Sequence, residues 1–256
     1  MGCDTLVAID RSAGFILGAV MEKAVVYCGT RNTYPEMAAA CKSLLRYNKD
    51  VHVYFLIEDA KFPDPDLPTD IITVRNVSKQ KYIKPDSPNA DNAWSWMVLL
   101  RGAYAKLFPK LDFILSLDND TFVEDDISAL WELPMDDYYY AAVREVELSK
   151  WFGKPYYNFG VSFHNLKKQR EDKVCDAIIE ELNTVKHDYP EQDVYIQKCE
   201  PHILELPGDW NIADFTTPFF TRKIRHMTGP GKWDWYPVHP QANQYRRMTW
   251  EKALRG

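Results

Sequence analysis

The sequence predicts an α/β domain, and three observations favour this class. Apolar runs of strand length alternate with segments of helical periodicity between residues 23 and 199. The chain has 256 residues, of which 46% are hydrophobic, so one domain can bury a large core without disulfide bonds. No linker or internal repeat interrupts this pattern, and we therefore expect a single domain over residues 21–256.

Residues 1–20 are expected to form an extension outside this domain. They lack the basic start of a signal peptide, and Asp10 and Arg11 interrupt their apolar stretch. A second methionine, Met21, then directly precedes the first strand-like run.

Six short apolar runs predict the strands. Each has the length of a strand, and Phe113–Leu117 has the continuous apolar character of a central strand in a sheet. In chain order they are Lys23–Cys28, Val51–Ile57, Ile71–Val74, Phe113–Leu117, Tyr138–Val143 and Asn158–His164.

Five segments with helical spacing of their apolar residues predict the helices. In chain order they are Pro35–Asn48, Ala93–Phe108, Ile127–Trp131, Asp172–Lys186 and Glu191–Cys199. Pro35 occupies the first turn of its helix, where the missing N–H is not needed, and Pro109 ends the second helix. The last sixty or so residues are rich in Trp, Pro and other loop signals.

Charge and cysteine content exclude several classes of protein. The net charge of −6 argues against a nucleic-acid partner, which a basic excess would favour. The five cysteines are scattered and form no CxxC pair, which argues against a zinc ribbon or a disulfide framework and favours a cytoplasmic location. No apolar run reaches roughly 18 residues, so no transmembrane segment is expected. The oligomeric state is left open.

Two carboxylates follow the predicted strand Phe113–Leu117, with one residue between them. In extended chain Asp118 and Asp120 point the same way, at the sheet edge where ligands of open α/β sheets bind. Two close negative charges are unfavourable unless a cation or a proton lies between them, so the pattern indicates a metal site. A solvated acidic turn is the alternative, because residues 124–126 are acidic as well.

The same motif leaves a second function open. A strand followed by DxD also occurs in phosphotransferases of the haloacid-dehalogenase type, where the first Asp is phosphorylated. In that class the motif normally begins the chain, whereas here it lies at residue 118. An EF-hand is excluded, because the loop lacks the required glycine and the final glutamate.

The stretch HMTGPGKWDW, residues 226–235, contains further candidates for ligand binding. The imidazole of His226 suits a manganese-like or zinc ion. Gly229 allows the backbone to approach a ligand closely, and Lys232 supplies a positive charge suited to phosphate. A lone histidine is otherwise more often structural.

Two more stretches, YYNFGVSFHNLKKQRE and YPEQDVYI, place polar side chains near element ends. Asn158 can orient hydroxyl groups at the start of a strand. Gln192 and Asp193 lie near a helix start, where helix capping is the alternative role for Asp193.

Together these stretches resemble the retaining glycosyltransferases of family 8 over roughly residues 23–235. The matching pieces occur in the family's order: VVYCGTRNTY, a helix with Arg101, ILSLDNDTFVEDDISALW, YYNFGVSFHNLKKQ, EQD, LPGDWN and HMTGPGKW. The resemblance implies a GT-A fold, in which an α/β sandwich surrounds a mostly parallel sheet and its first half binds a nucleotide. It also implies a UDP-sugar donor, Mn²⁺ or Mg²⁺ as cofactor, and a carbohydrate-type acceptor.

The resemblance further implies roles for individual residues. Asp118, Asp120 and His226 match the metal ligands. The residues that it places on the donor are Tyr34 (stacked on uracil), Arg101, Asn158 (near the sugar) and Lys232 (on the diphosphate). Further candidates for donor binding are Asp118, Asn119, Asp193 and Gly229. Gln192 matches the catalytic position beside the anomeric carbon. Two positions depart from the family: Arg31 and Glu191 stand where many members have an acidic residue and an Asp, respectively.

We therefore expect a metal-dependent retaining hexosyltransferase that transfers sugar from a UDP-sugar to a glycan, a lipid-linked sugar or a protein. Gln192 is a weak nucleophile, so its expected role is to stabilise a cation-like anomeric carbon. A DxD-based phosphatase or phosphotransferase and a non-catalytic nucleotide-sugar-binding module are the alternatives.

Overall fold

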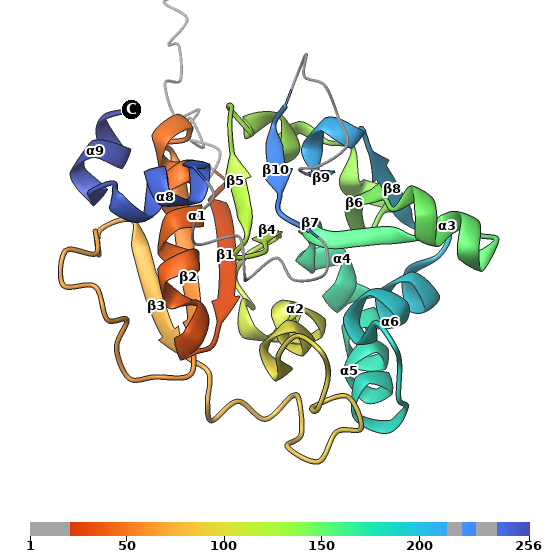
Figure 1. Cartoon of the computed structure of the whole chain (residues 1–256). Coiled ribbons are helices and arrows are strands. Elements are labelled where there is room, and N and C mark those ends of the chain that lie inside the picture. The colour runs from red at the N-terminus through yellow and green to blue at the C-terminus, as the bar shows by residue number, and fades with distance from the viewer. Residues whose placement is uncertain (1–20, 214–221, 229–239) are drawn as a thin grey trace, which may run out of the picture.

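A sheet of seven strands forms the centre of the protein, in the order β3-β2-β1-β4-β7-β6-β8 (Figure 1). Its members are β1 (Lys23–Gly29), β2 (Val51–Ile57), β3 (Ile72–Asn76), β4 (Phe113–Leu117), β6 (Tyr140–Arg144), β7 (Tyr157–Asn165) and β8 (Ile203–Leu206). Strand β7 runs antiparallel to both neighbours, and the remaining adjacent pairs are parallel. The expected α/β class with a mostly parallel sheet is confirmed.

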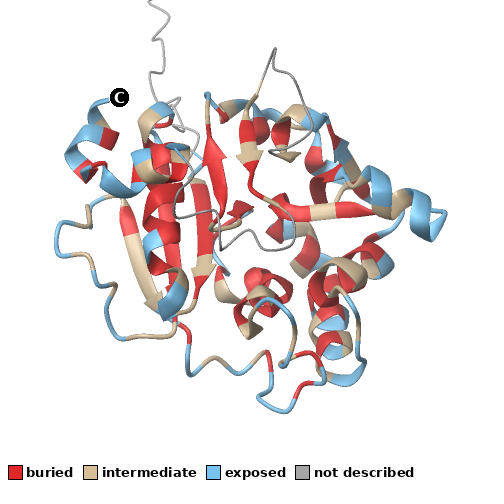
Figure 2. Cartoon of the chain, viewed as in Figure 1, coloured by how far each residue is buried: buried red, intermediate tan, exposed pale blue. Residues whose placement is uncertain are grey.

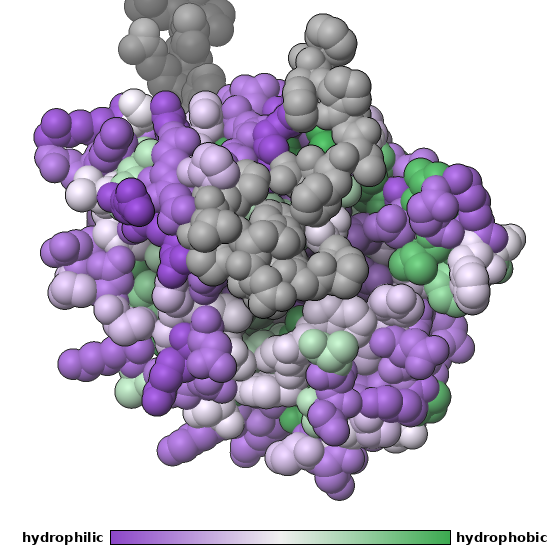
Figure 3. Space-filling model, viewed as in Figure 1, coloured by the Kyte–Doolittle hydropathy of each residue, from purple (hydrophilic) through white to green (hydrophobic). Residues whose placement is uncertain are grey.

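This computed structural model describes residues 21–213, 222–228 and 240–256. The extension expected at residues 1–20 lies outside the described residues. Within the described part of the chain, no helix has the length and apolar character needed to cross a membrane. The face shown in Figure 3 is mostly hydrophilic, with scattered hydrophobic side chains.

Helices cover both faces of the sheet because alternate residues of each strand face opposite sides. Val25 and Tyr27 of β1 belong to the core that includes α1 (Tyr34–Tyr47). Their neighbours Ala24 and Val26 belong to a second core. It includes the helices η2 (Trp96–Ala103), α2 (Tyr104–Leu107), α5 (Val174–Thr184) and α6 (Pro190–Cys199). Figure 2 shows buried residues along the central strands and on the helix faces beside them.

The helix predicted at Ala93–Phe108 is wrong in its start and its type. The chain forms the 3-10 helix η2 from Trp96 and only then a short α-helix, α2. The side chain of Asn92 accepts the backbone N–H groups of Trp94 and Ser95, which fixes a turn where a helix was expected. The segment predicted at Ile127–Trp131 is likewise a 3-10 helix, η3 (Ser128–Glu132).

Several short elements were not predicted. They are the 3-10 turns η1 (Arg31–Thr33), η4 (Met135–Asp137) and η5 (Gly208–Trp210), the helices α3 (Val146–Phe152) and α4 (Leu166–Glu171), and strand β8. None of these elements is longer than seven residues. Segments this short depend on tertiary contacts for their stability, so their local sequence signal is weak.

The C-terminal segment also contains more regular structure than its loop signals suggest. Helices α8 (Pro240–Arg247) and α9 (Trp250–Arg255) lie beside α1 (Figure 1). The ammonium group of Lys42 lies 4.7 Å from the ring centroid of Trp250, and Lys49 donates to the backbone carbonyl of Ala253 at 2.8 Å. These contacts hold the C-terminal end of the described chain against α1.

A second, three-stranded sheet has the order β5-β10-β9. It consists of β5 (Thr121–Val123), β9 (Ile212–Ala213) and β10 (Ile224–His226). Strand β5 begins directly after Asp120, and β10 pairs with it antiparallel so that His226 lies opposite Thr121. This register brings residues that are far apart in the sequence to the same sheet edge.

Candidate metal centre and its cavity

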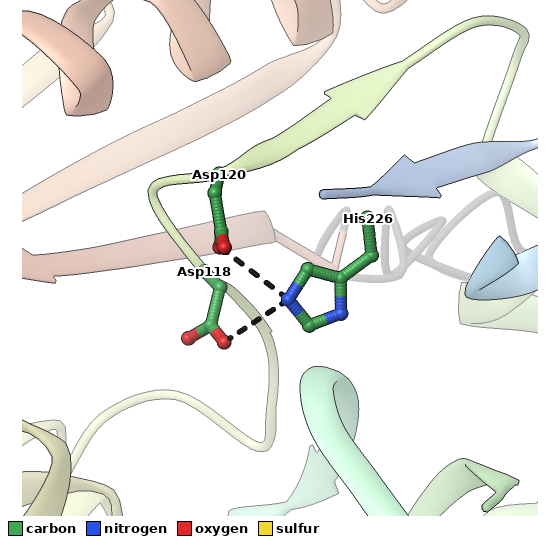
Figure 4. A group of neighbouring side chains, drawn as sticks. All are labelled: Asp118, Asp120 and His226. Atoms are coloured by element: carbon green, nitrogen blue, oxygen red, sulfur yellow. Dashed lines mark ion pairs between the residues drawn. The ribbon is translucent and has the colours of Figure 1, made fainter. Parts of the chain in front are cut away.

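Asp118, Asp120 and His226 converge at the carboxyl end of β4 (Figure 4). Nε2 of His226 lies 3.5 Å from Oδ2 of Asp118 and 3.4 Å from Oδ1 of Asp120. One ligand atom from each residue lies within 4.8 Å of the others, and Asp120 and His226 are buried. The sequence therefore predicted three side chains that the structure places together.

A chain of hydrogen bonds fixes the orientation of the His226 ring. The backbone N–H of Gly160 donates to Oδ1 of Asn158 at 2.9 Å, which identifies that atom as the amide oxygen. Nδ2 of Asn211 donates to the same oxygen at 2.7 Å, so Oδ1 of Asn211 is the atom 3.0 Å from Nδ1 of His226. Nδ1 must therefore carry a proton, because Asn211 offers it only an acceptor.

With a proton on Nδ1, His226 directs its other ring nitrogen, Nε2, toward the carboxylates of Asp118 and Asp120. Nε2 has no hydrogen-bond partner among the described residues. Two carboxylates and a ring nitrogen this close together, with Asp120 and His226 buried, favour positive charge between them, either a proton on Nε2 or a bound cation. A divalent cation fits this arrangement, and an imidazole held by a second hydrogen-bond acceptor is typical of metal ligands.

Gly160 leaves the space that the imidazole occupies. A Cβ atom at residue 160 would lie 2.0 Å from Cε1 of His226, far inside van der Waals contact. The carbonyl of Gly160 also accepts the backbone N–H of Asp118 at 2.8 Å. Strand β7 thus positions both the carboxylate loop and the histidine.

The three side chains line a cavity of ≈ 740 Å³. Several other residues singled out from the sequence also line it: Arg101, Asn119, Asn158 and Gln192. A cavity of this size lies within the range of small-molecule sites. The structure therefore gathers most of the predicted site residues around one space.

Arg101 lies between two carboxylates in the wall of this cavity. Its guanidinium forms ion pairs with Asp118 and, at 3.0 Å, with Glu191. Burial alone lowers the pKa of Arg101, but the charges of Asp118 and Glu191 outweigh it, so the net shift is upward. Burial raises the pKa of Glu191, and the charge of Arg101 opposes that shift. Arg101 is therefore a permanent cation that aligns the Asp118 carboxylate.

The amide of Gln192 is held in one orientation. Its Oε1 accepts the backbone N–H of Phe159 at 3.0 Å, and its Nε2 lies 3.4 Å from the hydroxyl of Tyr156. That hydroxyl donates to Asp193 at 2.7 Å, and Asp193 also accepts the backbone N–H of Tyr189 at 3.0 Å. Asp193 thus supports Gln192 through Tyr156 and caps α6, and it is not among the residues that line the cavity.

Asn119 connects the carboxylate loop to the loop after β1. Its Nδ2 donates to the backbone carbonyl of Cys28 at 2.8 Å and to the hydroxyl of Thr33 at 3.2 Å. Its Oδ1 is buried and has no hydrogen-bond partner among the described residues. An acceptor of this kind is available to a ligand that brings its own donor.

Tyr34 is not brought into the cavity. The residue is 2% exposed, its ring lies 5.2 Å from that of Phe62, and its hydroxyl accepts the backbone N–H of Glu58 at 3.3 Å. It begins α1 and fills the space between that helix and the segment after β2, so it has no free face for stacking on a base. Gly229 and Lys232 lie outside the described residues.

Glu145 and Asn211 are residues of the site that the sequence did not single out. Glu145 lines the cavity and accepts Nδ2 of Asn158 at 3.2 Å. It directly follows β6, which runs in the direction of β4, so the rule that ligands bind at carboxyl ends of strands could have identified it. Asn211 belongs to the quoted LPGDWN stretch, but nothing local indicates its contact with His226.

The family model of "Glycosyl transferase family 8" matches residues 24–217 of the chain. Glycosyltransferase GlyD of Streptococcus pneumoniae is 26% identical over 265 residues, covering 90% of this chain and 30% of that protein. The probable glycosyl transferase Gly of Streptococcus gordonii is 26% identical over 213 residues, which cover 77% of this chain and 29% of that protein. The chain thus spans about 30% of the length of these curated relatives.

Solved structures show the same fold. Glycosyltransferase GlyE of Streptococcus pneumoniae superposes with a TM-score of 0.71 at 20% identity, covering 92% of this chain and 62% of that chain. The galactosyltransferase LgtC, solved with donor and acceptor sugar analogues, gives a TM-score of 0.66 at 19% identity, with coverages of 90% and 95%. The sheet described above is therefore that of a GT-A glycosyltransferase fold.

Proposed function

This chain belongs to glycosyltransferase family 8, and from that premise we propose that it transfers a hexose from a UDP-sugar with the help of a divalent cation. The observation that carries the proposal is the convergence of Asp118, Asp120 and His226 in the wall of the ≈ 740 Å³ cavity. A diphosphate leaving group carries negative charge that a cation held by these residues can neutralise.

The proposed cation is Mn²⁺, with Mg²⁺ as the second choice. Two carboxylates and one imidazole are a mixed oxygen and nitrogen set, whereas Mg²⁺ favours oxygen ligands alone. When bound, the cation would supply Lewis-acid neutralisation of the diphosphate as UDP leaves.

The proposed donor site includes residues on either side of the Asp118 and Asp120 carboxylates. Arg101 holds Asp118 in place through a buried ion pair, and Asn119 offers its unsatisfied oxygen at the loop after β1. We assign Gly229 and Lys232 to the diphosphate, where the Lys232 charge would stabilise the leaving group. The stacking role of Tyr34 is not retained.

On the sugar side, we propose that Gln192 stabilises the anomeric carbon as it becomes cation-like. Its Oε1 keeps a second lone pair beyond the hydrogen bond from Phe159. Asn158 is assigned to the sugar hydroxyls, and Asp193 supports Gln192 through Tyr156. The carboxylates of Glu145 and Glu191 are engaged by Asn158 and Arg101, so neither is proposed as a nucleophile.

The proposed reaction retains the anomeric configuration. The bond from the anomeric carbon to the diphosphate oxygen breaks, and the acceptor hydroxyl forms its new bond on the same face. The hydroxyl proton leaves with the diphosphate. The proposed acceptor is carbohydrate-like, and the proposed location is cytoplasmic, for which the four unpaired cysteines among the described residues are the supporting observation.

The test is a screen of UDP-sugars for Mn²⁺-dependent release of UDP, together with titration of Mn²⁺ by electron paramagnetic resonance. Asp120→Asn and His226→Ala should each weaken Mn²⁺ binding by at least about tenfold and abolish turnover. His202→Ala is the matched control, because His202 is exposed and lies outside the cavity.

Three results would contradict the proposal. They are wild-type Mn²⁺ affinity in both site variants, an inverted product by NMR, and phosphate release from simple phosphomonoesters without any UDP-sugar turnover. The last result would favour the DxD phosphotransferase instead.

A further inference from the structure

Trp94 and Tyr189 form an aromatic pair in the wall of the cavity, away from the carboxylates. Their ring centroids are 5.6 Å apart at an interplanar angle of 44°. Both residues line the cavity, and Trp94 is 50% exposed. Two paired rings in one wall give the cavity an aromatic surface that a ligand can contact.

The loop that carries Trp94 is fixed rather than free. Asn92 accepts the backbone N–H of Trp94 at 2.8 Å, and the fully buried Asn89 donates to the backbone carbonyls of Leu182 and Val185 at 2.8 and 2.6 Å. These bonds attach the loop to the end of α5. The exposed ring is therefore preorganised, which lowers the entropy lost when a ligand binds.

Tyr189 places the pair beside the proposed reacting carbon. It immediately precedes α6, in whose first turn Gln192 lies, and its backbone N–H donates to Asp193. Its ring packs edge-on against Tyr156, which in turn lies 3.4 Å from the Gln192 amide. A group resting on Trp94 and Tyr189 would thus lie next to the transferred sugar.

The charges around the cavity indicate a neutral ligand at this position. Among the described lining residues, Arg101 is the permanent cation, and its guanidinium is committed to Asp118 and Glu191. Apart from Arg101, the lining residues that the structure describes include no lysine or arginine. A flat aromatic surface next to hydrogen-bonding side chains suits a pyranose, which presents C–H groups on one face and hydroxyls at its edge.

We propose that Trp94 and Tyr189 form the acceptor subsite and stack on the apolar face of a neutral pyranose. This inference deepens the proposed function and rests on it. The group that we propose at this position is thus a neutral sugar and not a lipid phosphate or a bare peptide side chain.

Saturation-transfer NMR with the methyl glycosides of glucose, galactose and N-acetylglucosamine, each with UDP and Mn²⁺ present, tests the subsite. At least one glycoside should receive saturation from the wild-type protein. Trp94→Ala should weaken that binding roughly five- to tenfold, and Trp94→Phe should restore part of it because a ring is kept. Trp151→Ala is the matched control: Trp151 is 84% exposed and lies outside the cavity lining.

Each other outcome overturns the inference. If no glycoside bound the wild-type protein, or if Trp94→Ala and Trp151→Ala lost the same amount of glycoside affinity, Trp94 and Tyr189 would not form an acceptor subsite. A tenfold loss of UDP affinity in Trp94→Ala with glycoside binding intact assigns the ring to the donor's base. Donor turnover by the wild type is measured separately, so that a failure of the proposed function is told apart from a failure of the subsite.

Discussion

Gly160 and His226 are in such close contact that no side chain larger than hydrogen fits at residue 160. A Cβ atom there would lie 2.0 Å from Cε1 and 2.4 Å from Nδ1 of the imidazole. Gly160 lies within β7, and its carbonyl accepts the backbone N–H of Asp118 at 2.8 Å, so a shift of its backbone would also disturb the carboxylate loop. The position of the candidate metal ligand thus depends on a glycine in the adjacent strand.

Gly160→Ala is expected to displace the His226 ring and to weaken Mn²⁺ binding by about tenfold or more. Electron paramagnetic resonance titration of Mn²⁺ measures the change. Gly208→Ala is the control, because a Cβ at residue 208 has no atom within 4 Å. Equal Mn²⁺ affinities in the two variants would show that the ring does not hold the ion.

Asn211→Leu removes the acceptor that fixes the proton on Nδ1 of His226. We expect a loss of Mn²⁺ affinity of about 10- to 100-fold, the usual effect of losing the partner of a metal-ligating histidine. Asn211→Asp keeps an acceptor for Nδ1 and should retain more affinity than Asn211→Leu. Calorimetric titration with Mn²⁺ measures the affinity of both variants. If Asn211→Asp bound Mn²⁺ more weakly than Asn211→Leu, that result would contradict the proposed hydrogen-bond chain.

Arg101→Met leaves the buried carboxylate of Glu191 without its cationic partner. We expect the free energy of unfolding to fall by about 3–5 kcal/mol, as measured by urea denaturation. Arg144→Met breaks a pair with Glu205 in which both side chains are 44% exposed, so its effect on the free energy of unfolding should be much smaller than that of Arg101→Met. Similar losses in the two variants would mean that the buried pair has no special role in stability.

His164 should make stability depend on pH. Its ring is fully buried, and burial followed by the charge of Arg101 lowers its pKa from 6.5 to about 3. Because the folded-state pKa is depressed, the stabilisation is present above pH 6.5 and is lost as the pH falls toward 3. Between pH 7 and pH 5 the loss should be about 2 kcal/mol.

The measurement is urea denaturation of the wild type and of His164→Gln at both pH values. The variant lacks the titrating group, so its stability should fall by less between pH 7 and pH 5. A wild type and a variant with the same pH dependence would show that His164 does not titrate in this way.

Much of the fold could be predicted because its signals are local. The runs KAVVYC, VHVYFLI and FILSL became β1, β2 and β4 with shifts of at most one residue. Asp118 and Asp120 lie at the end of β4, so the ligand-binding edge followed from that strand alone. Short elements such as β10, with three residues, gave no such signal, because their stability comes from pairing rather than from propensity.

The sequence by itself therefore determined the α/β class, the central strands and the candidate metal ligands. Only the tertiary structure decided how they meet: β10 pairs with β5 and sets His226 opposite Thr121, beside Asp120. It also decided that Asn211 orients His226, that Tyr34 is buried against Phe62, and that Trp94 lies on the cavity wall. Local patterns fix which face of an element is buried, whereas contacts between distant segments depend on how those elements pack together.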